Sequence, residues 1–583
     1  MSSSKTDPPL RVLTPRLAES RPNIPSSVDR KTGSAETVDT VSHEGPPSPH
    51  GRGAAFWVVF ASLSLMALLS AMEGGIMSTA LPSISRAVNA EGNYVLIVNV
   101  YVLASAAVQP LYGQVADLWG TRWPMLSSIT IFATGSAMCG AANDIATLIG
   151  GRTIQGFGVA GINILAEVIL SDLLPMRLRE RDQFMGFIFL FTVLGSLLGP
   201  FLGGIIIGGA SWRWIFLLNL PFCGFCLGLL FISLKPAKAR SNDDRTPLQK
   251  VKSIKYDVGI ILLCASVTSV LYVMAYGGSG AEYPWSHPII ITALVLGLLG
   301  HVLFIAFEVS PWCHNPVLPM PQNRTSIAAY VLEVLQTLVS CGTLYFLPLY
   351  FQSTLAVSPQ TSGVLLLPFS ISFCISPALG GGLANNSGRF RSFHVISFIL
   401  MTITMGIFTL LGHDTPLSAT AIIGIMAGIS VGLPSASILA VIRTALPNSL
   451  ETANSAFALI RSISTAFAFS IPAAVFNNRF DQLLAASTLD SSVRENLQLG
   501  KAYQQASSDM FNTQAEVVGI YELSLKLVWQ ILIGVAAVGI AASLVEKNLE
   551  FHPDATTDEE FGLEESKGRP SNKSEVRMSG MNT

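Results

Sequence analysis

Gly113-Gln-Val-Ala-Asp117-Leu-Trp-Gly120-Thr-Arg122 stands between two long apolar stretches of the chain. Its pattern returns at residues 381–389, which read Gly381-Gly-Leu-Ala-Asn385-Asn-Ser-Gly388-Arg389. Both copies place glycine at positions 1 and 8, alanine at position 4, and aspartate or its amide at position 5. Both also fall on a turn between two apolar segments. A repeated turn in matching surroundings predicts two related halves of the kind from which many membrane transporters are built.

The composition requires a lipid environment for most of the chain. Of the 583 residues 50% are hydrophobic and 12% are charged, whereas soluble domains carry about 25% charged residues. About 20 apolar residues cross a bilayer as a helix, and fourteen segments satisfy this requirement. They are residues 57–76, 94–113, 125–142, 145–168, 184–206, 215–234, 257–276, 288–307, 327–351, 361–380, 394–411, 418–440, 452–475 and 523–545. The predicted fold class is an all-α polytopic membrane protein.

Basic residues orient these segments. The loops on one side hold most of the arginine and lysine, including Arg177, Arg179, Arg181 and the run from Lys235 to Lys255. Since cytosolic loops carry the positive excess, we expect both termini in the cytosol. We expect the first segment to serve as the insertion signal, because the residues before it do not have the pattern of a cleavable signal peptide.

The same reading divides the chain into regions. We expect disordered cytosolic ends at residues 1–54 and 547–583, where too little apolar surface is present to form a core. Between them we expect a six-helix bundle (55–234), a basic cytosolic loop (235–256), two additional helices (257–307), a cytosolic loop (308–326) and a second six-helix bundle (327–546). The second bundle contains a long outer loop (477–522), in which amphipathic residues predict one or two helices on the membrane surface.

Several functions are excluded by composition and motif. A formal net charge of −2 gives no positive excess for holding a nucleic acid. The odd number of cysteines, seven, and their places in apolar runs do not form a disulfide framework. No hydrolase, P-loop or metalloprotease motif is present. We therefore expect no enzyme activity, no metal and no cofactor.

Four motifs resemble those of the major facilitator superfamily, in its 14-span drug:proton antiporter branch. The first loop copy is similar to that superfamily's loop signature, and Ser78-Thr79-Ala80-Leu81-Pro82 is usual in the branch. The stretch Arg152-Thr-Ile-Gln155-Gly156-Phe-Gly158-Val-Ala160 is similar to R-x-x-Q-G-x-G-x-A. The stretch Gly195-Ser-Leu-Leu-Gly199-Pro200-Phe-Leu-Gly203-Gly204 resembles the antiporter signature G-x-x-x-G-P-x-x-G-G. The resemblance covers about residues 55–545 and implies two six-helix bundles with two extra middle helices.

Two structural roles follow for these motifs. In the repeated loop, the first glycine is expected to allow close helix approach, the second to turn the chain, and the aspartate or asparagine to cap a helix. The gating loop so defined comprises Gly113, Asp117, Gly120, Arg122, Asn385, Gly388 and Arg389. In the antiporter helix, Pro200 is expected to kink the chain while glycines four apart form a groove for a neighbouring helix. Its residues are Gly195, Gly199, Pro200, Gly203 and Gly204.

Ionisable groups at membrane depth are costly and usually face a cavity. The resemblance implies proton coupling for Arg152, and the alternative is a structural ion pair. Glu73 is either the proton carrier or a solvated side chain near the outer boundary. Glu333 lines the cavity or makes a packing contact, and Arg461 is equally open to both. The candidate coupling and cavity residues are Glu73, Arg152, Gln155, Glu167, Glu333, Gln336 and Arg461.

The function expected from this resemblance is proton-coupled export of a small amphipathic compound, such as a drug, toxin or secondary metabolite. The alternative is an importer or vacuolar carrier, for example of siderophores or basic amino acids. The expected partners are the small-molecule substrate, protons and the lipid bilayer, with the chain acting as a monomer. The plasma membrane is the expected location, and the vacuolar membrane is the alternative.

Overall fold

The computed structural model describes residues 53–90, 94–174, 178–234, 258–277, 283–310, 324–387, 389–445, 450–498, 501–506 and 515–547. Thirteen of the fourteen predicted segments each overlap one described helix, and the sixth overlaps two consecutive helices. Eleven of the described helices are long and apolar enough to cross a membrane. The all-α membrane fold is therefore confirmed, while fourteen crossings remains a prediction.

Some predicted regions cannot be compared with the structure. The basic loop 235–256, most of both tails and residues 311–323 of the second cytosolic loop lie outside the described residues, as does Gly388. The division of the chain into domains at the predicted boundaries remains a prediction.

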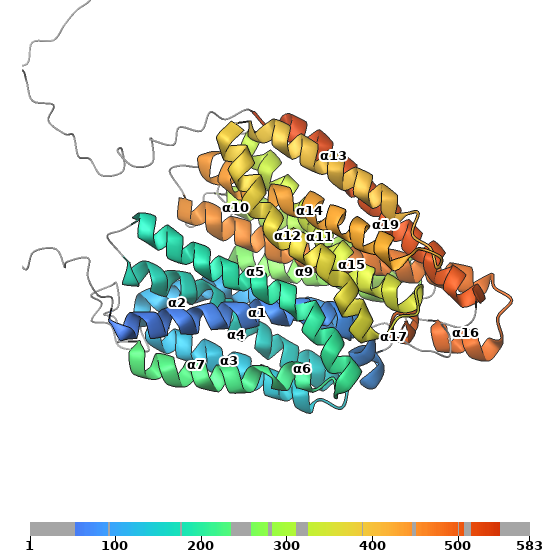
Figure 1. Ribbon diagram of the computed structural model, residues 1–583, viewed down its shortest axis with the longest axis horizontal. Helices are drawn as coiled ribbons and strands as arrows, with labels where there is room; N and C mark the ends of the chain where they lie inside the picture. Colours follow the sequence, from blue (N-terminus) through green and yellow to red (C-terminus); the bar gives the residue numbers. More distant parts are fainter. Residues whose placement is uncertain are drawn as a thin grey trace, which may run out of the picture. The chain divides into compact units, whose positions relative to one another are not determined.

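The first half of the chain forms one bundle, on the lower side of Figure 1. Within it, α1 packs along α5, and α4 packs between α2 and α3. The sixth predicted segment is divided between two helices that meet at Leu218. The helices are α1 (Ala54–Ala87), α2 (Tyr94–Trp119), α3 (Arg122–Ala141), α4 (Ile145–Leu173), α5 (Leu178–Gly209), α6 (Trp214–Leu217) and α7 (Asn219–Ser233).

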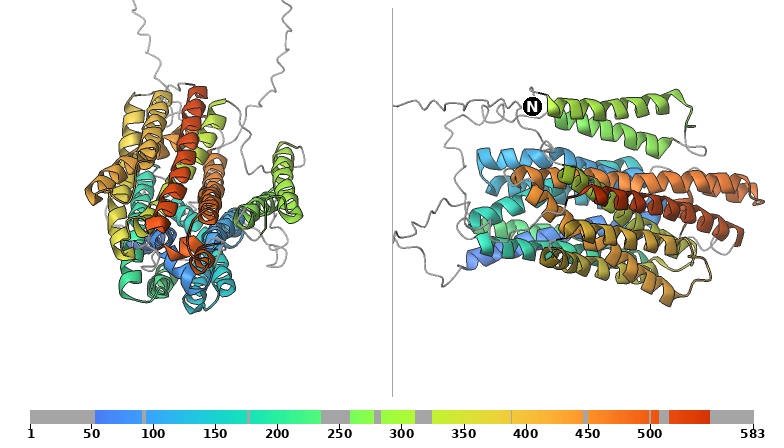
Figure 2. Two further views of the ribbon diagram at one scale, coloured as in Figure 1. Left: turned by 90° about the vertical axis from the view of Figure 1, so that its right-hand side faces the viewer. Right: turned by 90° about the horizontal axis from the view of Figure 1, so that it is seen from above.

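The second half forms another bundle, on the upper side of Figure 1. Here α12 packs along α14, and α19 packs against α11, α13 and α15. Its helices are α11 (Arg324–Ser353), α12 (Pro359–Ser387), α13 (Phe390–Phe408), α14 (Leu417–Ala445), α15 (Leu450–Ala485) and α19 (Ala515–Val545), with short helices α16 (Ser491–Leu497) and α17 (Lys501–Gln505) in the outer loop. The two middle helices, α9 (Val258–Tyr276) and α10 (Pro288–Val309), form a hairpin that stands beside α2 and α15 (Figure 2).

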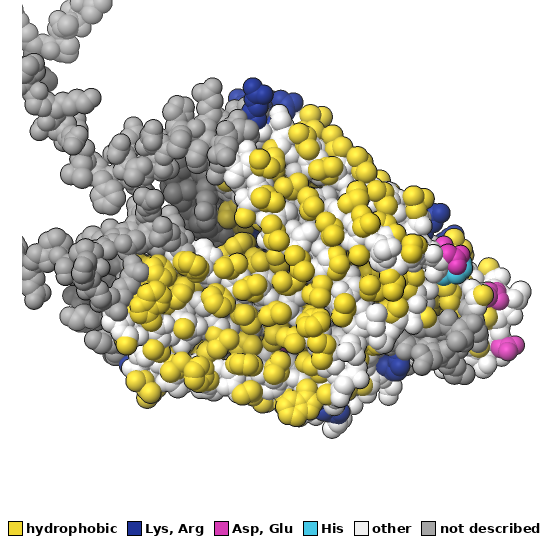
Figure 3. Space-filling model, viewed as in Figure 1, with side chains coloured by type: hydrophobic (Ala, Val, Ile, Leu, Met, Phe, Trp, Pro, Cys, Tyr) yellow, Lys and Arg dark blue, Asp and Glu magenta, His cyan; other side chains and the backbone are white. Residues whose placement is uncertain are grey.

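The outward surface of the helices is apolar. Large hydrophobic side chains are exposed on α7, α10, α12 and α14, among them Ile232, Val302, Leu383 and Ile422. Figure 3 shows hydrophobic side chains across the face of the helices and charged ones gathered at its rims. Such a surface is stable against lipid chains and would be an aggregation hazard in water.

Glycines allow α1 and α5 to pack closely, as predicted for the antiporter helix. A Cβ at Gly195 would lie 2.2 Å from the carbonyl oxygen of Leu68, and one at Gly199 would lie 2.7 Å from that of Met72. Gly203 meets α1 in the same way, through Ile76. Since side chains at these positions would force the backbones apart, the predicted close-packed face is confirmed.

The next glycine in the signature faces the other half of the protein. A Cβ at Gly204 would lie 2.5 Å from the carbonyl oxygen of Pro359, at the start of α12. On the α1 side, the Thr79 hydroxyl donates a hydrogen bond of 2.8 Å to the carbonyl oxygen of Pro200. The helix α5 is thus in close contact with α1 of its own half and with α12 of the other.

The repeated loop is partly as predicted. Gly120 has φ 78° and turns the chain between α2 and α3, which confirms its expected role. A Cβ at Gly113 would have no neighbouring atom within 4 Å, so the predicted close helix approach at this glycine is wrong. Asp117 and Asn385 lie inside α2 and α12, and the N-caps of α3 and α13 are Thr121 and Arg389. The predicted capping role is wrong because each preceding helix extends further than its apolar residues indicate.

The outer loop differs from its predicted place on the membrane surface. The helix α15 continues to Ala485, so Phe480 and Leu484 are buried within the protein. The ring of Phe480 packs 4.8 Å, centroid to centroid, from that of Tyr521 on α19. Leu497 of α16 is also fully buried. These apolar residues are covered by neighbouring helices and not by lipid. The sequence of the loop alone does not show which of the two would cover them.

We expect Gly195→Ala to lower the thermal stability of the detergent-solubilised protein, because the new Cβ would overlap the carbonyl oxygen of Leu68. Overpacking of this kind costs about 1–3 kcal/mol. The matched control is Gly186→Ala on the same helix, where a Cβ meets nothing within 4 Å. Equal melting temperatures for the two variants would contradict the close contact between α1 and α5.

Candidate functional site

A buried ion pair lies inside the first bundle. Glu73 of α1 and Arg152 of α4 are both fully buried, and Arg152 Nη1 lies 2.6 Å from Glu73 Oε1. Each residue interrupts a long run of small and apolar side chains. The helices therefore carry two opposite charges into a region where neither could remain alone.

Polar groups from three further helices complete the pair. Arg152 donates to Gln155 Oε1 (2.8 Å) and, through Nε, to the carbonyl oxygen of Ile97 on α2 (3.2 Å). Asn219, at the start of α7, donates to Glu73 Oε2 (2.8 Å), and Gln155 donates to Ser136 of α3 (2.9 Å). Both carboxylate oxygens of Glu73 are thus satisfied. We refer to Glu73, Ser136, Arg152, Gln155 and Asn219 as the buried polar network.

Aromatic rings surround the guanidinium of Arg152. Its Cζ lies 4.2 Å from the ring centroid of Tyr101 and 6.0 Å from that of Phe216. A cation over an aromatic face is stabilised, and more strongly when water is excluded. Arg152 Nη2 has no hydrogen-bond partner among the described residues. The two N–H groups of Nη2 are therefore unpaired among the described residues.

A second ion pair lies in the other bundle. Arg461 Nε of α15 lies 2.7 Å from Glu333 Oε1 of α11, with Glu333 fully buried and the Arg461 side chain 43% exposed. Thr337 donates weakly to the same oxygen (3.4 Å), and Gln336 donates to the carbonyl oxygen of Val431 on α14 (3.0 Å). The structure joins Glu333 to Arg461, two residues that the sequence left as separate candidates.

Other predicted residues lie apart from these pairs. Glu167 is on α4 with Arg152 but is exposed, about four turns further along the helix. Arg122 donates to the carbonyl oxygen of Phe231 (2.6 Å), which joins the start of α3 to the end of α7. Arg389 is the N-cap of α13, and the side chains of Asp117 and Asn385 lie outside the described residues.

Five polar residues that the sequence analysis did not name as candidates lie in two buried clusters. Ser136 and Asn219 belong to the buried polar network. Asn219 could have been found in the sequence, because it is a polar amide at the start of the otherwise apolar helix α7. A further cluster joins His394 Nδ1 of α13 to Glu546 Oε2 (2.8 Å) and His394 Nε2 to Ser437 Oγ of α14 (2.9 Å). Glu546 follows the last helix immediately, where a solvated position would ordinarily be expected.

The two bundles are joined toward the end that the predicted topology places outside the cell. Asn99 of α2 donates to Ser470 of α15 (2.5 Å), and Gln352 of α11 donates to the carbonyl oxygen of Thr79 on α1 (3.3 Å). At the first residue of α2, Tyr94 donates to Asn477 Oδ1 of α15 (3.1 Å). These contacts join helices of opposite halves on one side of the protein.

The short helix α17 adds to this contact. The ring of Tyr503 stacks on that of Tyr94, with 4.3 Å between centroids and 12° between planes. Arg86, near the end of α1, donates two hydrogen bonds to the carbonyl oxygen of Gln504 (3.2 and 2.9 Å). A segment of the second half thereby contacts two helices of the first. We refer to the contacts of Arg86, Tyr94, Asn99, Gln352 and Tyr503 as the outer closure.

Comparison with solved structures supports the fold. The chain is similar to a peptide transporter POT in complex with sulfate, with TM-score 0.56, 14% identity, and coverage of 85% of this chain and 96% of that one. It is also similar to a bacterial homologue of the human lysosomal transporter Spinster in an inward-facing, occupied conformation. In that comparison the TM-score is 0.54, the identity 13%, and the coverage 86% and 100%.

Sequence comparison is more specific. The model of the Major Facilitator Superfamily matches residues 63–469. The MFS-type efflux transporter pyiT of Pyricularia grisea is 46% identical over 568 residues, covering 93% of each chain. The MFS-type efflux transporter ffsH of Aspergillus flavipes is 38% identical over 570 residues, covering 95% of this chain and 96% of the relative. With the fold, the repeat and these matches in agreement, the chain belongs to the major facilitator superfamily, a family of multi-pass membrane transporters.

Proposed function

We propose that this transporter exports small amphipathic organic compounds, such as a drug, toxin or secondary metabolite, in exchange for protons. The observation that carries the coupling is the fully buried Glu73–Arg152 pair within the polar network. The relatives are named as efflux transporters, which supports transport of the compound out of the cell. The substrate is thus a small molecule, which the protein would carry across the lipid bilayer.

The pair can couple a proton to the arrangement of its helices. Protonation of Glu73 would remove its negative charge and leave the Arg152 guanidinium buried without a counter-charge, a costly state. The helices α1, α4 and α7, which the network holds together, would then favour another arrangement. Loss of the proton would restore the pair, so the carboxylate can bias the protein between two states.

The outer closure supports alternating access for this transporter. Its contacts join the halves at the end that the predicted topology places outside, an arrangement expected of a transporter that is closed on that side. Release of an exported compound would require the Tyr94–Tyr503 stack and the Arg86–Gln504 hydrogen bonds to separate. Both tyrosine rings are fully buried in the arrangement described, so their separation would expose them.

The second ion pair is proposed to line the substrate cavity. Glu333 is buried, whereas the Arg461 side chain is 43% exposed and extends over the ring of Phe457 at 4.6 Å. An exposed cation beside an aromatic face in the second bundle is suited to contact an amphipathic compound. We further propose that the chain acts as a monomer in the plasma membrane, with the vacuolar membrane as the alternative.

Glu73→Gln should abolish proton-driven extrusion while retaining substrate exchange. Glutamine keeps the size of the side chain but cannot release a proton, and exchange at equal pH needs no coupling. The measurement compares gradient-driven flux and counterflow of a fluorescent amphipathic compound in sealed vesicles at matched protein content. Arg152→Ala should reduce gradient-driven flux at least about tenfold, since a lost charge-assisted pair is worth more than about 1.4 kcal/mol.

The outcome separates coupling from general damage. If Glu73→Gln loses both gradient-driven flux and counterflow, the residue is needed for the fold or for binding, and the coupling role fails. If both activities persist, Glu73 is not the proton site.

The Glu333–Arg461 pair gives an asymmetric prediction. Arg461→Ala should lower the melting temperature more than Glu333→Gln, because it leaves a fully buried carboxylate without its partner. Glu333→Gln leaves only a half-exposed arginine, which water can solvate. The difference should be roughly 1–3 kcal/mol, measured by thermal unfolding in detergent, and a larger loss for Glu333→Gln would refute the assignment of burial.

Tyr503→Ala should open the outer side. In a cysteine-free background, Val98→Cys places a thiol one turn from Tyr94, at a position that is 3% exposed. We expect a membrane-impermeant thiol reagent added outside to label it several-fold faster once the stack on Tyr94 is lost. Arg494→Ala is the matched control in the same loop, since Arg494 contacts Ser487 and not the first half. Unchanged labelling in Tyr503→Ala would show that α17 does not hold the closure.

A further inference from the structure

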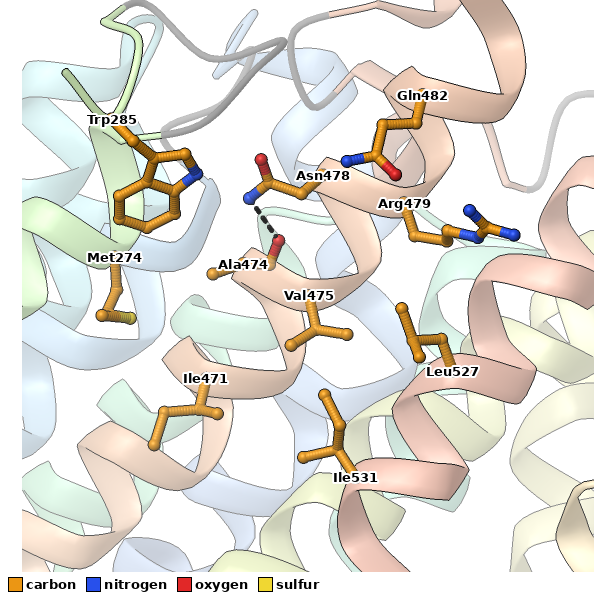
Figure 4. Close-up of a pocket in the computed structure, with 10 residues that line it drawn as sticks. All are labelled: Met274, Trp285, Ile471, Ala474, Val475, Asn478, Arg479, Gln482, Leu527 and Ile531. Atoms are coloured by element: carbon orange, nitrogen blue, oxygen red, sulfur yellow. Dashed lines mark hydrogen bonds between the residues drawn. The ribbon is translucent and has the colours of Figure 1, made fainter. Parts of the chain in front are cut away.

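A groove of about 420 Å³ lies on the side of the protein, away from both ion pairs. Its floor is α15, with Ile471 and Val475; one wall is the α9–α10 hairpin, with Met274 and Trp285, and the other is α19. Figure 4 shows these three elements around the groove, with Leu527 and Ile531 projecting from α19. The groove is thus formed where the extra hairpin meets the second bundle.

The two ends of the groove differ in chemistry. Ile471, Val475 and Ile531 line one end, whereas Asn478, Arg479 and Gln482 gather toward the other (Figure 4). In the predicted topology the C-terminal end of α15 lies at the outer face of the membrane. The polar end therefore lies nearer to the headgroups, and eight residues of helix, about 12 Å, separate Ile471 from Arg479 along the acyl-chain region.

Arg479 is a partly buried cation with no ion-pair partner among the residues that the structure describes. It forms no hydrogen bond or ion pair with any described residue, in contrast to Arg152 and Arg461. Arginine binds phosphate oxygens through paired N–H groups, with more strength than neutral donors achieve. An anionic oxygen from outside the chain would complete this side chain.

The position of Trp285 also indicates that the polar end of the groove lies at the depth of the headgroups. It lies in the loop between α9 and α10 and is 42% exposed at the polar part of the groove. Tryptophan is enriched where acyl chains meet headgroups, because its ring is apolar and its N–H can donate. The groove therefore has the features that a phospholipid needs. Its apolar end suits an acyl chain, the tryptophan lies at the depth where acyl chains meet headgroups, and the unpaired arginine suits the phosphate.

We propose that this groove is a binding site for a phospholipid of the outer leaflet. The phosphate is held by Arg479, and one acyl chain runs along Ile471, Val475 and Ile531. Lipid bound there would fill the gap between the hairpin and α15, and would hold the two middle helices against the second bundle. This site is independent of the export function proposed above.

The test uses native mass spectrometry of the full chain, delipidated in detergent and titrated with dioleoylphosphatidylcholine. We expect Arg479→Ala to weaken the most tightly held lipid about tenfold, the scale of a lost charge-assisted hydrogen bond. Val475→Trp, which fills the apolar end, should weaken it similarly while Arg479 remains. Arg479→Lys should retain part of the affinity. The control is Lys526→Ala, which removes an exposed cation of α19 that does not line the groove.

Two further probes distinguish the sources of the interaction. Dioleoylglycerol, which lacks phosphate, should bind the parent more weakly than the phospholipid does. It should bind the parent and Arg479→Ala with equal affinity. Inorganic phosphate should fail to displace the lipid. The proposal is overturned if Arg479→Ala binds phosphatidylcholine as the parent does, if Lys526→Ala loses as much, or if phosphate alone competes, which would indicate a simple anion site. Melting temperatures equal to the parent's exclude misfolding as the cause of any loss.

Discussion

Charge neutralisation inside an apolar bundle is the constraint on which this structure depends. Arg152 cannot be removed from water alone, so α4 must lie where Glu73 of α1, the Ile97 carbonyl of α2 and the Tyr101 ring can meet it. Asn219 then fixes the remaining carboxylate oxygen from α7. One arginine thereby sets the relative positions of several helices, and the same dependence makes the bundle sensitive to the protonation of a single carboxylate.

Close packing at glycines is the second feature that determines the arrangement of the helices. Gly195, Gly199 and Gly203 allow α1, which carries Glu73, to lie against α5, while Gly204 sets α5 against α12 of the second bundle. The helix that bears the proposed proton site is therefore in direct contact with the helix that joins the two halves. A change in the ion pair has a short physical route to the interface at which the halves would move.

Much of this was predictable from the sequence, for identifiable reasons. Apolar length located the helices, the repeated turn indicated two halves, and the spacing of glycines predicted a close-packed face on α5, although not that α1 would occupy it. Pairing was not predictable, because no single sequence gives the distance from Glu333 to Arg461 or from Glu73 to Asn219. Glu167 lies apart from Arg152 because fifteen residues of helix, about 22 Å, separate the two, and its side chain is exposed. Tyr503 was missed because its partner Tyr94 lies in the other half.

The central claim is that Glu73 gains and loses the coupled proton. Infrared difference spectroscopy on the reconstituted protein, recorded as the pH is lowered, reports the appearance of a protonated carboxylic acid. We expect one component of the carboxylic acid band to be present in the parent and in Glu333→Gln, and to be missing from Glu73→Gln. A band of undiminished intensity in Glu73→Gln would contradict this claim and place the proton on another carboxylate.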